Sequence, residues 1–421
     1  MSSDTGTMTV EKGYKVTEVG VIPEEWGIAS LGSVCTKITD GSHSSPPATT
    51  EGYFMASVKD MRRNGFDFSK CKVISEADHR KLVKQGCKPL VGDVLIAKDG
   101  SVLEQVFVQE KNEDITILSS IAILRPQKEI LKSVFLSQFL SWNYFRAKIR
   151  KEFTSGSALP RIILKNFRLI HIPLPPFPEQ EKIAEILSTV DEHIGETEDL
   201  IEKTETLKKG MMQRLLTQGI GHTEFKNTEI GRIPAEWEVQ PLSTAFYVNK
   251  HSMPSTTDGN MLINYIDIQS VAKGRISEYK QLKFSDSPSR ARRIAQSGDV
   301  IISTVRPYLK AFAQITSTLA NQVCSTGFAV LSTRNANHAS NNYLSHFVFS
   351  DTFIKQLEEK MVGSNYPAVN SSDVGNTHIS LPSIQEQRQI ADILTAIDDQ
   401  IEEYRSKLGK LNQLKTGLMQ Q

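Results

Sequence analysis

The sequence PEQEKIAEILSTVDEHI (178–194) returns as QEQRQIADILTAIDDQI (385–401), 207 positions further along the 421-residue chain. Eight of the sixteen pairs that align 179–194 with 386–401 are identical. The alignment runs without a gap from 156–214 onto 363–421. Matches of this length and order indicate duplication rather than chance. A period near 207 residues far exceeds the roughly 20–50 residues of solenoid repeats, so the repeated unit is a whole domain with its helix.

Shorter repeats extend the duplication towards the start of each copy. They are EVGVIPEEWGIASL (18–31) with EIGRIPAEWEVQPL (229–242), GDVLIA (92–97) with GDVIIS (298–303), SIAIL (120–124) with GFAVL (327–331), and GSALP (156–160) with GSNYP (363–367). Strand-like runs at 94–97, 115–118 and 121–124, followed by a helical stretch at 131–151, favour a mixed α/β globule. Each copy is therefore predicted to be a globule followed by a long helix.

These repeats predict a domain organisation with six segments. They are an N-terminal arm (1–14), a first globule (15–178), a first spacer helix (179–216), a linker (217–228), a second globule (229–382) and a second spacer helix (383–421).

Apolar residues recur at steps of three and four through both helical segments, which is typical of a helix with one apolar face. In the first they are Ile183, Leu187, Val190, Ile194, Ile201, Leu207 and Met211, and in the second Ile390, Leu394, Ile397, Ile401, Leu408, Leu411, Leu414 and Leu418. Pro178 suits a first helical turn, and Ser383 with Glu386 fits an S-x-x-E capping box.

About 36 residues form a rod of roughly 54 Å, which is longer than a small domain can bury along its length. The simplest mate for each helix is the other copy. We therefore predict an antiparallel coiled coil that separates two pseudo-symmetric globules. Two ordinary helices inside one core are the alternative.

The composition, with 39% hydrophobic, 23% charged and 7% aromatic residues, is that of a soluble globular protein. No stretch approaches about 18 apolar residues and the first residues do not resemble a signal peptide, so we expect a cytoplasmic protein without membrane contact.

The net charge of +1 is the sum of segments that differ in the sign of their charge. Residues 27–175 hold 22 Lys and Arg against 14 Asp and Glu, residues 238–382 hold 13 against 10, and residues 176–214 hold 5 against 10. The two basic globules could face phosphates, although ordinary solvated surfaces are the alternative.

Candidate DNA-contacting residues lie near turns and in basic clusters of both globules. They are His43, Lys59, Arg62, Arg63, Asn64, Lys98 and Arg161 in the first, and Arg275, Arg290, Arg292, Arg293, Arg306, Tyr308, Lys310, Asn365 and Tyr366 in the second. Arg and Lys can pair with guanine edges, Asn with adenine, and any cation with phosphate. The two tyrosines could stack on a base, and solvated cations and core-edge tyrosines are the alternatives.

The sequence contains no recognisable catalytic motif. LPPF (174–177) resembles the loop with which amino-methyltransferases hold the target base, but Leu174 cannot accept a hydrogen bond from an amine. GDVLIAK (92–98) has Ile96 where a nuclease would need an acidic residue. Four scattered cysteines form no metal-type spacing and are expected to be reduced structural thiols. We therefore expect no catalytic and no metal site.

Together, the duplicated plan, the IPEEW and IPAEW openings, and the segments PLPPFPEQEKIAEIL (173–187) and LPSIQEQRQIADIL (381–394) resemble the specificity (S) subunit of type I restriction-modification systems. The resemblance implies that each globule is a target-recognition domain for one half of a bipartite, asymmetric DNA site, on an antiparallel helical spacer. It also implies two methyltransferase (M) subunits that methylate adenine, and two nuclease-translocase (R) subunits as optional partners that cleave DNA. S-adenosylmethionine, ATP and Mg²⁺ would be bound by these partners, and no cofactor by this chain.

Three alternative hypotheses stay open. The chain could be a scaffold that binds proteins and not DNA, the specificity subunit of a modification-only phage-defence system, or an enzyme with an unfamiliar site. Salt-dependent DNA binding would separate the first from a DNA-recognition subunit.

Overall fold

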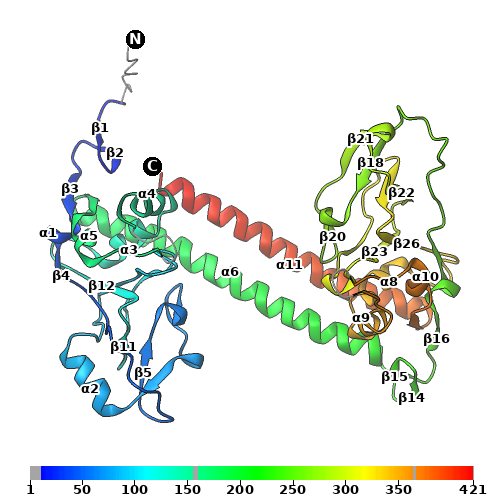
Figure 1. The fold of residues 1–421 in the computed structure, drawn as a ribbon, viewed down its shortest axis with the longest axis horizontal. Coiled ribbons are helices and arrows are strands. Elements are labelled where there is room, and N and C mark those ends of the chain that lie inside the picture. The colour runs from blue at the N-terminus through cyan, green and yellow to red at the C-terminus, as the bar shows by residue number, and fades with distance from the viewer. Residues whose placement is uncertain (1–10, 155–159, 364–366, 421) are drawn as a thin grey trace. The chain divides into compact units, whose positions relative to one another are not determined.

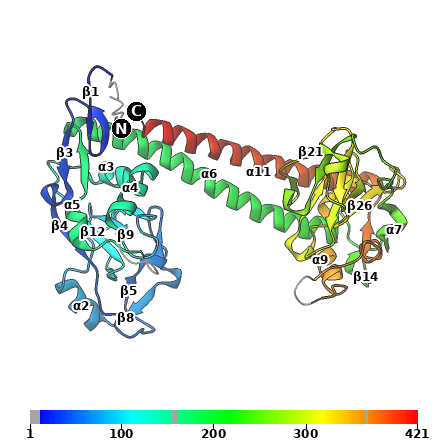
Figure 2. The same ribbon diagram turned by 45° about the horizontal axis from the view of Figure 1, so that its top comes forward.

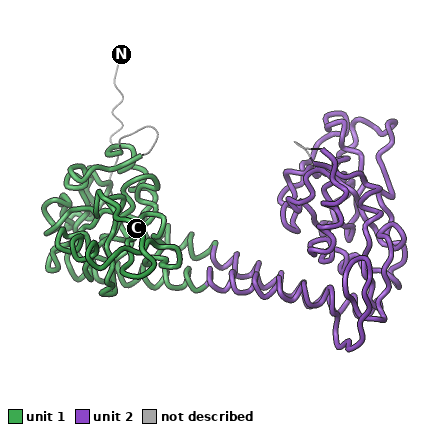
Figure 3. The backbone as a smooth tube through the Cα atoms, turned by 60° about the horizontal axis from the view of Figure 1, so that its bottom comes forward, with its two compact units in different colours: residues 1–196, 409–421 green, residues 197–408 purple. Residues whose placement is uncertain are grey.

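The computed structural model describes residues 11–154, 160–363 and 367–420. The chain divides into two compact units, residues 1–196 with 409–421 (unit 1) and residues 197–408 (unit 2) (Figure 3). Each unit contains one globule. The two long helices α6 (Phe177–Gln218) and α11 (Ile384–Leu418) each contribute to both units.

The core of unit 1 is a four-stranded sheet. Its order is β10 (Val106–Val108), β9 (Val94–Ala97), β12 (Ile121–Pro126) and β4 (Cys35–Asp40). Every residue of β9 is fully buried, as its uninterrupted apolar sequence predicts. The sheet packs on α3 (Ser133–Ser141), α4 (Asn143–Phe153) and α5 (Leu164–Leu169). The predicted helical stretch is thus two helices, which separate at Trp142 because that residue has extended backbone.

Unit 2 repeats this sheet with the same strand order. The strands are β24 (Phe312–Gln314), β23 (Val300–Ser303), β26 (Phe328–Thr333) and β17 (Phe246–Val248), and they pack on α8 (Asn341–Phe347) and α9 (Asp351–Glu358).

The two globules differ in their second sheets. Unit 1 has three strands, in the order β11 (Thr116–Ile117), β5 (Tyr53–Ala56) and β8 (Lys72–Ile74), with helix α2 (Glu76–Lys84) following. Unit 2 has four, in the order β21 (Lys280–Lys283), β18 (Leu262–Ile266), β25 (Gln322–Ser325) and β22 (Ala291–Ile294). The duplication therefore conserved the first sheet, while the second changed.

Small two-stranded ribbons complete both units. In unit 1 they are β1 (Tyr14–Thr17) with β2 (Gly20–Pro23), β3 (Gly27–Ser30) with β13 (His171–Leu174), and β6 (Met61–Arg62) with β7 (Gly65–Phe66). In unit 2 they are β14 (Phe225–Thr228) with β15 (Gly231–Pro234), β16 (Glu238–Pro241) with β27 (His378–Leu381), and β19 (Val271–Ala272) with β20 (Arg275–Ile276). The predicted linker 217–228 thus contains the last two residues of α6 and all of β14.

The long helices lie side by side and run antiparallel (Figures 1 and 2). In unit 2, Glu205 pairs with Arg405 at 2.5 Å and Lys208 pairs with Asp398 at 2.5 Å, so α11 descends in number as α6 ascends. This arrangement is the predicted antiparallel coiled coil.

Burial along the helices follows the predicted stripe with two exceptions. Leu187, Val190, Ile194, Ile390, Leu394 and Ile401 are buried, and Ile183, Ile201, Met211, Ile397, Leu408, Leu411 and Leu418 are half-buried. Leu207 and Leu414, which are equivalent positions of the repeat and belong to the predicted apolar stripe, are 55% and 51% exposed. The stripe is wider than the face that the neighbouring helix covers.

The starts of the helices are fixed by side chains that reach the globules. Ser383 accepts a hydrogen bond from the Glu386 amide at 3.3 Å, which is half of the predicted capping box. The other half was wrong, because the Glu386 carboxylate accepts from the Trp237 indole at 3.1 Å and from the Ile220 amide at 2.9 Å. Glu179 of α6 accepts from the Trp26 indole at 3.0 Å in the same way.

A buried glutamine follows each of these glutamates. Gln180 accepts from the Lys132 amide and donates to the Ile130 and Pro175 carbonyls, all at 3.0 Å. Gln387 makes the equivalent three hydrogen bonds at 2.9 Å, with the backbone of Ser340, His338 and Pro382. Each glutamine therefore joins its helix to a globule entirely through backbone groups.

Candidate nucleic-acid interface

In unit 1 the turn after β9 meets the segment that follows GSALP. The Gly100 amide donates to the Pro160 carbonyl at 2.8 Å, and the Ile162 amide donates to the Lys98 carbonyl at 3.0 Å. Asp99 and Arg161 form an isolated antiparallel bridge between these hydrogen bonds. The fold therefore brings Lys98 and Arg161, two candidates that lie far apart in sequence, to one junction.

Unit 2 builds the same junction. The Arg306 amide donates to the Pro367 carbonyl at 2.8 Å, and the Val369 amide donates to the Thr304 carbonyl at 2.9 Å. Val305 and Ala368 form the corresponding bridge. The backbone is thus repeated, whereas the side chains change from Lys98 and Gly100 to Thr304 and Arg306.

Charged groups at the unit 1 junction are partly neutralised. The ammonium of Lys98 lies 3.4 Å from Asp40 and 3.3 Å from Asp99, and only 8% of this side chain is exposed. His43 lies 3.3 Å from the same Asp40 and is 78% exposed. Because Lys98 is buried and paired, the groups of this junction that can reach a ligand are those of His43 and the exposed Arg161.

The other unit 1 candidates lie on or beside the β6–β7 ribbon. Arg62 pairs with Asp67 at 2.7 Å, while Lys59 and Asn64 are exposed. Arg63 is bonded to Asp191 on α6. One of the four is therefore directed to the long helix.

Some of the unit 2 candidates are exposed to solvent, and others contact groups of the protein. Arg275 pairs with Glu402 on α11, and Arg292 lies over the Phe284 ring at 4.9 Å. Arg293 donates to the Ser252 hydroxyl at 3.3 Å, and Arg290 is exposed. Tyr308 is exposed and Lys310 is half-buried on the turn that begins at Arg306, while Asn365 and Tyr366 lie outside the described residues.

Two structural roles were missed by sequence reasoning from single motifs. One is the pairing of Trp26 with Glu179 and of Trp237 with Glu386. The other is the ion pair of Asp191 with Lys415, 2.8 Å from each carboxylate oxygen. Comparing polar residues between the two copies would have singled them out, because all of them recur in the repeat.

The four cysteines are free and buried. Within residues 11–154, 160–363 and 367–420, no group of three or more His, Cys, Asp or Glu residues could hold a metal ion. Burial raises the pKa of the Cys35 thiol to about 12 and that of Cys71 to about 11, so both stay protonated near neutral pH. None of the described helices is long and apolar enough to span a membrane.

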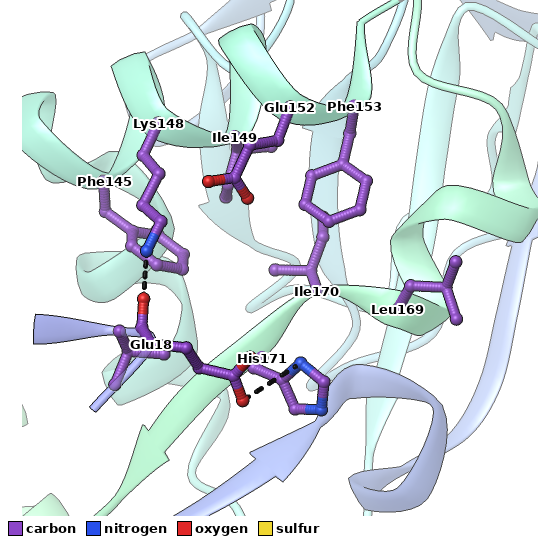
Figure 4. Close-up of a pocket in the computed structure, with 10 residues that line it drawn as sticks. Glu18, Phe145, Lys148, Ile149, Glu152, Phe153, Leu169, Ile170 and His171 are labelled. Atoms are coloured by element: carbon purple, nitrogen blue, oxygen red, sulfur yellow. Dashed lines mark hydrogen bonds and ion pairs between the residues drawn. The ribbon is translucent and has the colours of Figure 1, made fainter.

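A small cavity of about 170 Å³ lies elsewhere in unit 1, between α4 and the start of β13 (Figure 4). Lys148 and His171 both reach Glu18 there, Lys148 through a bond to its carbonyl and His171 at 3.4 Å from its carboxylate. A larger groove of about 1000 Å³ in unit 2 is lined by α6, α11, β20 and neighbouring loops. Cations and carboxylates are mixed along it, so it has no single sign of charge.

The family model of the type I restriction modification DNA specificity domain matches this chain twice, at residues 23–206 and 234–413. The specificity subunit of the type I restriction enzyme MjaVIII of Methanocaldococcus jannaschii is 27% identical, over 97% of this chain and 94% of its own. That of EcoKI from Escherichia coli K12 is 23% identical, over 95% and 89%.

Solved structures share the fold. The S subunit of a type I restriction-modification system from M. genitalium superposes with a TM-score of 0.60 at 15% identity, over 94% of this chain and 95% of that one. A chain from a study of complex assembly and conformational transition in a type I system gives 0.52 at 19% identity, over 95% and 97%. The chain therefore belongs to the family of type I restriction-modification DNA specificity subunits. Its function in that family is to recognise a DNA sequence.

Proposed function

We propose that each globule reads one half of a bipartite, asymmetric site in double-stranded DNA, and that the chain directs adenine methylation without catalysing it. The observation that carries this proposal is the junction built twice from one backbone pattern with different side chains. The shared backbone of the two junctions would place corresponding residues of the two globules against DNA in the same way. Because the side chains at these positions differ, each globule would select different bases.

The partners are two methyltransferase subunits, which dock on the long helices and supply the reaction and its S-adenosylmethionine. Exposed apolar residues at equivalent positions of the repeat support two docking surfaces. They are Ile186 with Ile393, 41% and 37% exposed, and Leu207 with Leu414, 55% and 51% exposed. When the paired helix leaves apolar side chains exposed, these side chains are typical of a surface on which further helices pack.

Two nuclease-translocase subunits, which use ATP and Mg²⁺, are further partners when the system also cleaves DNA. The complex acts in the cytoplasm, where the DNA lies.

The decisive experiment is long-read modification sequencing of DNA from cells that express this chain together with its methyltransferase, against cells that express the methyltransferase alone. The expected result is a new methyladenine motif in two separated parts. No new mark, although both proteins are present and associated, would contradict the proposal.

Matched variants sharpen this test because the chain offers one arginine at each junction. We expect Arg161→Gln to relax the bases read in one half of the motif and Arg306→Gln to relax those in the other. A direct base contact is worth about 1–3 kcal/mol, so methylation should spread to sites with one changed letter. If both variants relaxed the same half, each globule could not be reading its own half.

A further inference from the structure

The turn after the second strand of each central sheet differs sharply between the units. In unit 1 it runs from Gly100 to Glu104, and in unit 2 from Arg306 to Lys310. At its tip, Val102 and Leu103 of unit 1 are 2% and 0% exposed and belong to the hydrophobic core. The equivalent Tyr308 and Leu309 of unit 2 are 41% and 60% exposed.

The exposed tip is held in a defined shape. Arg306 and Lys310, which flank it, have φ values of 47° and 55°, in the left-handed region that residues with a side chain rarely adopt. Unit 1 has Gly100 at the position of Arg306. A strained conformation persists only where its surroundings determine it, and such positions cluster at functional sites.

The surroundings that determine this conformation are visible. The Leu309 amide donates to the Arg306 carbonyl at 2.9 Å, and the Lys310 amide to the Pro307 carbonyl at 2.8 Å. Pro307 is buried, and α9 packs against the turn. The tip is therefore a firm protrusion rather than a loose loop.

We propose that Leu309 enters a base step of the half-site read by unit 2, with Tyr308 stacked on the displaced base. Proteins that kink DNA insert apolar side chains such as leucine between base pairs and hold the neighbouring phosphates with cations. Lys310 beside the apolar tip can hold such a phosphate, while Arg306 is the base-contacting candidate, and these two cations favour DNA over an apolar protein surface. The inference deepens the proposed function, because it rests on unit 2 reading a half-site.

The insertion is expected from unit 2 and not from unit 1. Val102 and Leu103 are fixed in the unit 1 core, where Arg150 is bonded to the Val102 carbonyl. Unit 1 has no exposed apolar pair at this turn, so the kink occurs in one half-site of the two. Flexible pyrimidine–purine steps should be preferred at that position, because they unstack at least cost.

The test uses the complex of the full-length chain with its methyltransferase and a duplex that carries the motif found by sequencing. 2-Aminopurine replaces in turn each purine of both half-sites except the adenine that the methyltransferase extrudes for methylation, and its fluorescence rises where a base is unstacked. With the wild type we expect a rise at one step of one half-site. With Leu309→Ala we expect that signal to vanish and the affinity to fall at least about tenfold. Because Leu309 is exposed, its removal should leave the melting temperature unchanged.

Two controls separate insertion from other effects. Leu319→Ala removes a leucine of unit 2 that is 46% exposed and does not belong to the 306–310 turn, and should change neither signal nor affinity. A duplex with an abasic position at the affected step is already unstacked, so Leu309→Ala should bind it nearly as well as the wild type does.

Wild-type affinity and fluorescence in Leu309→Ala would overturn the insertion while leaving the recognition function intact. Loss of methyltransferase binding in Leu309→Ala, with no unstacking by the wild type, would mean that the tip contacts protein. Failure of the wild-type complex to methylate any two-part motif would instead overturn the proposed function itself.

Discussion

Lys415 donates to both carboxylate oxygens of Asp191 at 2.8 Å in unit 1, and the equivalent Lys208 donates to Asp398 at 2.5 Å in unit 2. Each long helix thus carries an aspartate and a lysine 17 residues apart. In an antiparallel pair, the aspartate of either helix meets the lysine of the other. A parallel pair in register would place aspartate beside aspartate, so these charges favour the observed direction.

The unit 2 pair can be tested by a charge exchange at pH 7, where the neighbouring His346 is neutral. Lys208→Asp or Asp398→Lys alone should lower the stability of the chain, because each places like charges together, while the double exchange should recover most of the loss. Since these side chains are 25% and 38% exposed, we expect a coupling free energy of about 1 kcal/mol. Denaturant unfolding of the four proteins measures it, and single losses that simply add would argue against the pairing.

The Asp191 carboxylate should make the stability of the fold sensitive to acid. Burial raises its pKa, but hydrogen bonds from Lys415 and Gln138, together with the charge of Lys415 and the bond from Arg63, outweigh burial and lower the pKa below its usual value. The ionised group thus stabilises the fold above about pH 4, and this contribution is lost as the pH falls through the lowered pKa. Asp191→Asn should cost about 2 kcal/mol at pH 7 and progressively less below pH 4. Urea unfolding across pH 2–7 would show the two curves converging, and parallel curves would contradict the assignment.

His346 predicts a second pH dependence, in unit 2. Burial lowers the pKa of His346 to about 4, against the attraction of Asp398 and with a further lowering by Lys208. The unfolded chain binds a proton there below about pH 6.5 whereas the folded chain does not, so the fold loses about 3 kcal/mol between pH 6.5 and 4. In His346→Gln this loss should disappear, while the amide keeps a partner for the Thr395 hydroxyl. Matched pH–stability curves of the wild type and the variant would test it, and an unchanged slope would mean that His346 is protonated when folded.

Buried and exposed positions of the helices should separate folding from assembly. Ile401 is 4% exposed, so Ile401→Asp should cost about 3 kcal/mol or more and lower the melting temperature. Leu414 is 51% exposed, and Leu414→Asp should leave melting unchanged but weaken binding of the methyltransferase about tenfold. Calorimetry and co-purification of both variants give the two readouts. Normal co-purification of Leu414→Asp would remove this leucine from the docking surface.

The sequence predicted the architecture well because the decisive signals are local or repeated. Alternating apolar residues and the 207-residue offset were enough for two globules and two long helices. Side-chain partners were harder to predict. Lys98 lies beside an Asp-Gly turn, where a lysine is usually solvated, and yet its side chain is only 8% exposed beside Asp40. Arg63 was predicted to face DNA on the strength of its charge, and its bond to Asp191 is formed across 128 positions of sequence. Such partners depend on how elements pack, which local sequence does not specify.

The two glutamines at the helix starts have a consequence for how the protein diversifies. Gln180 and Gln387 reach only backbone atoms of their globules, and main-chain groups are offered by almost any sequence. Side chains of the globule around each glutamine can therefore be substituted without loss of these hydrogen bonds. Recognition surfaces could change in this way through evolution while the attachment of each globule to its helix stays the same.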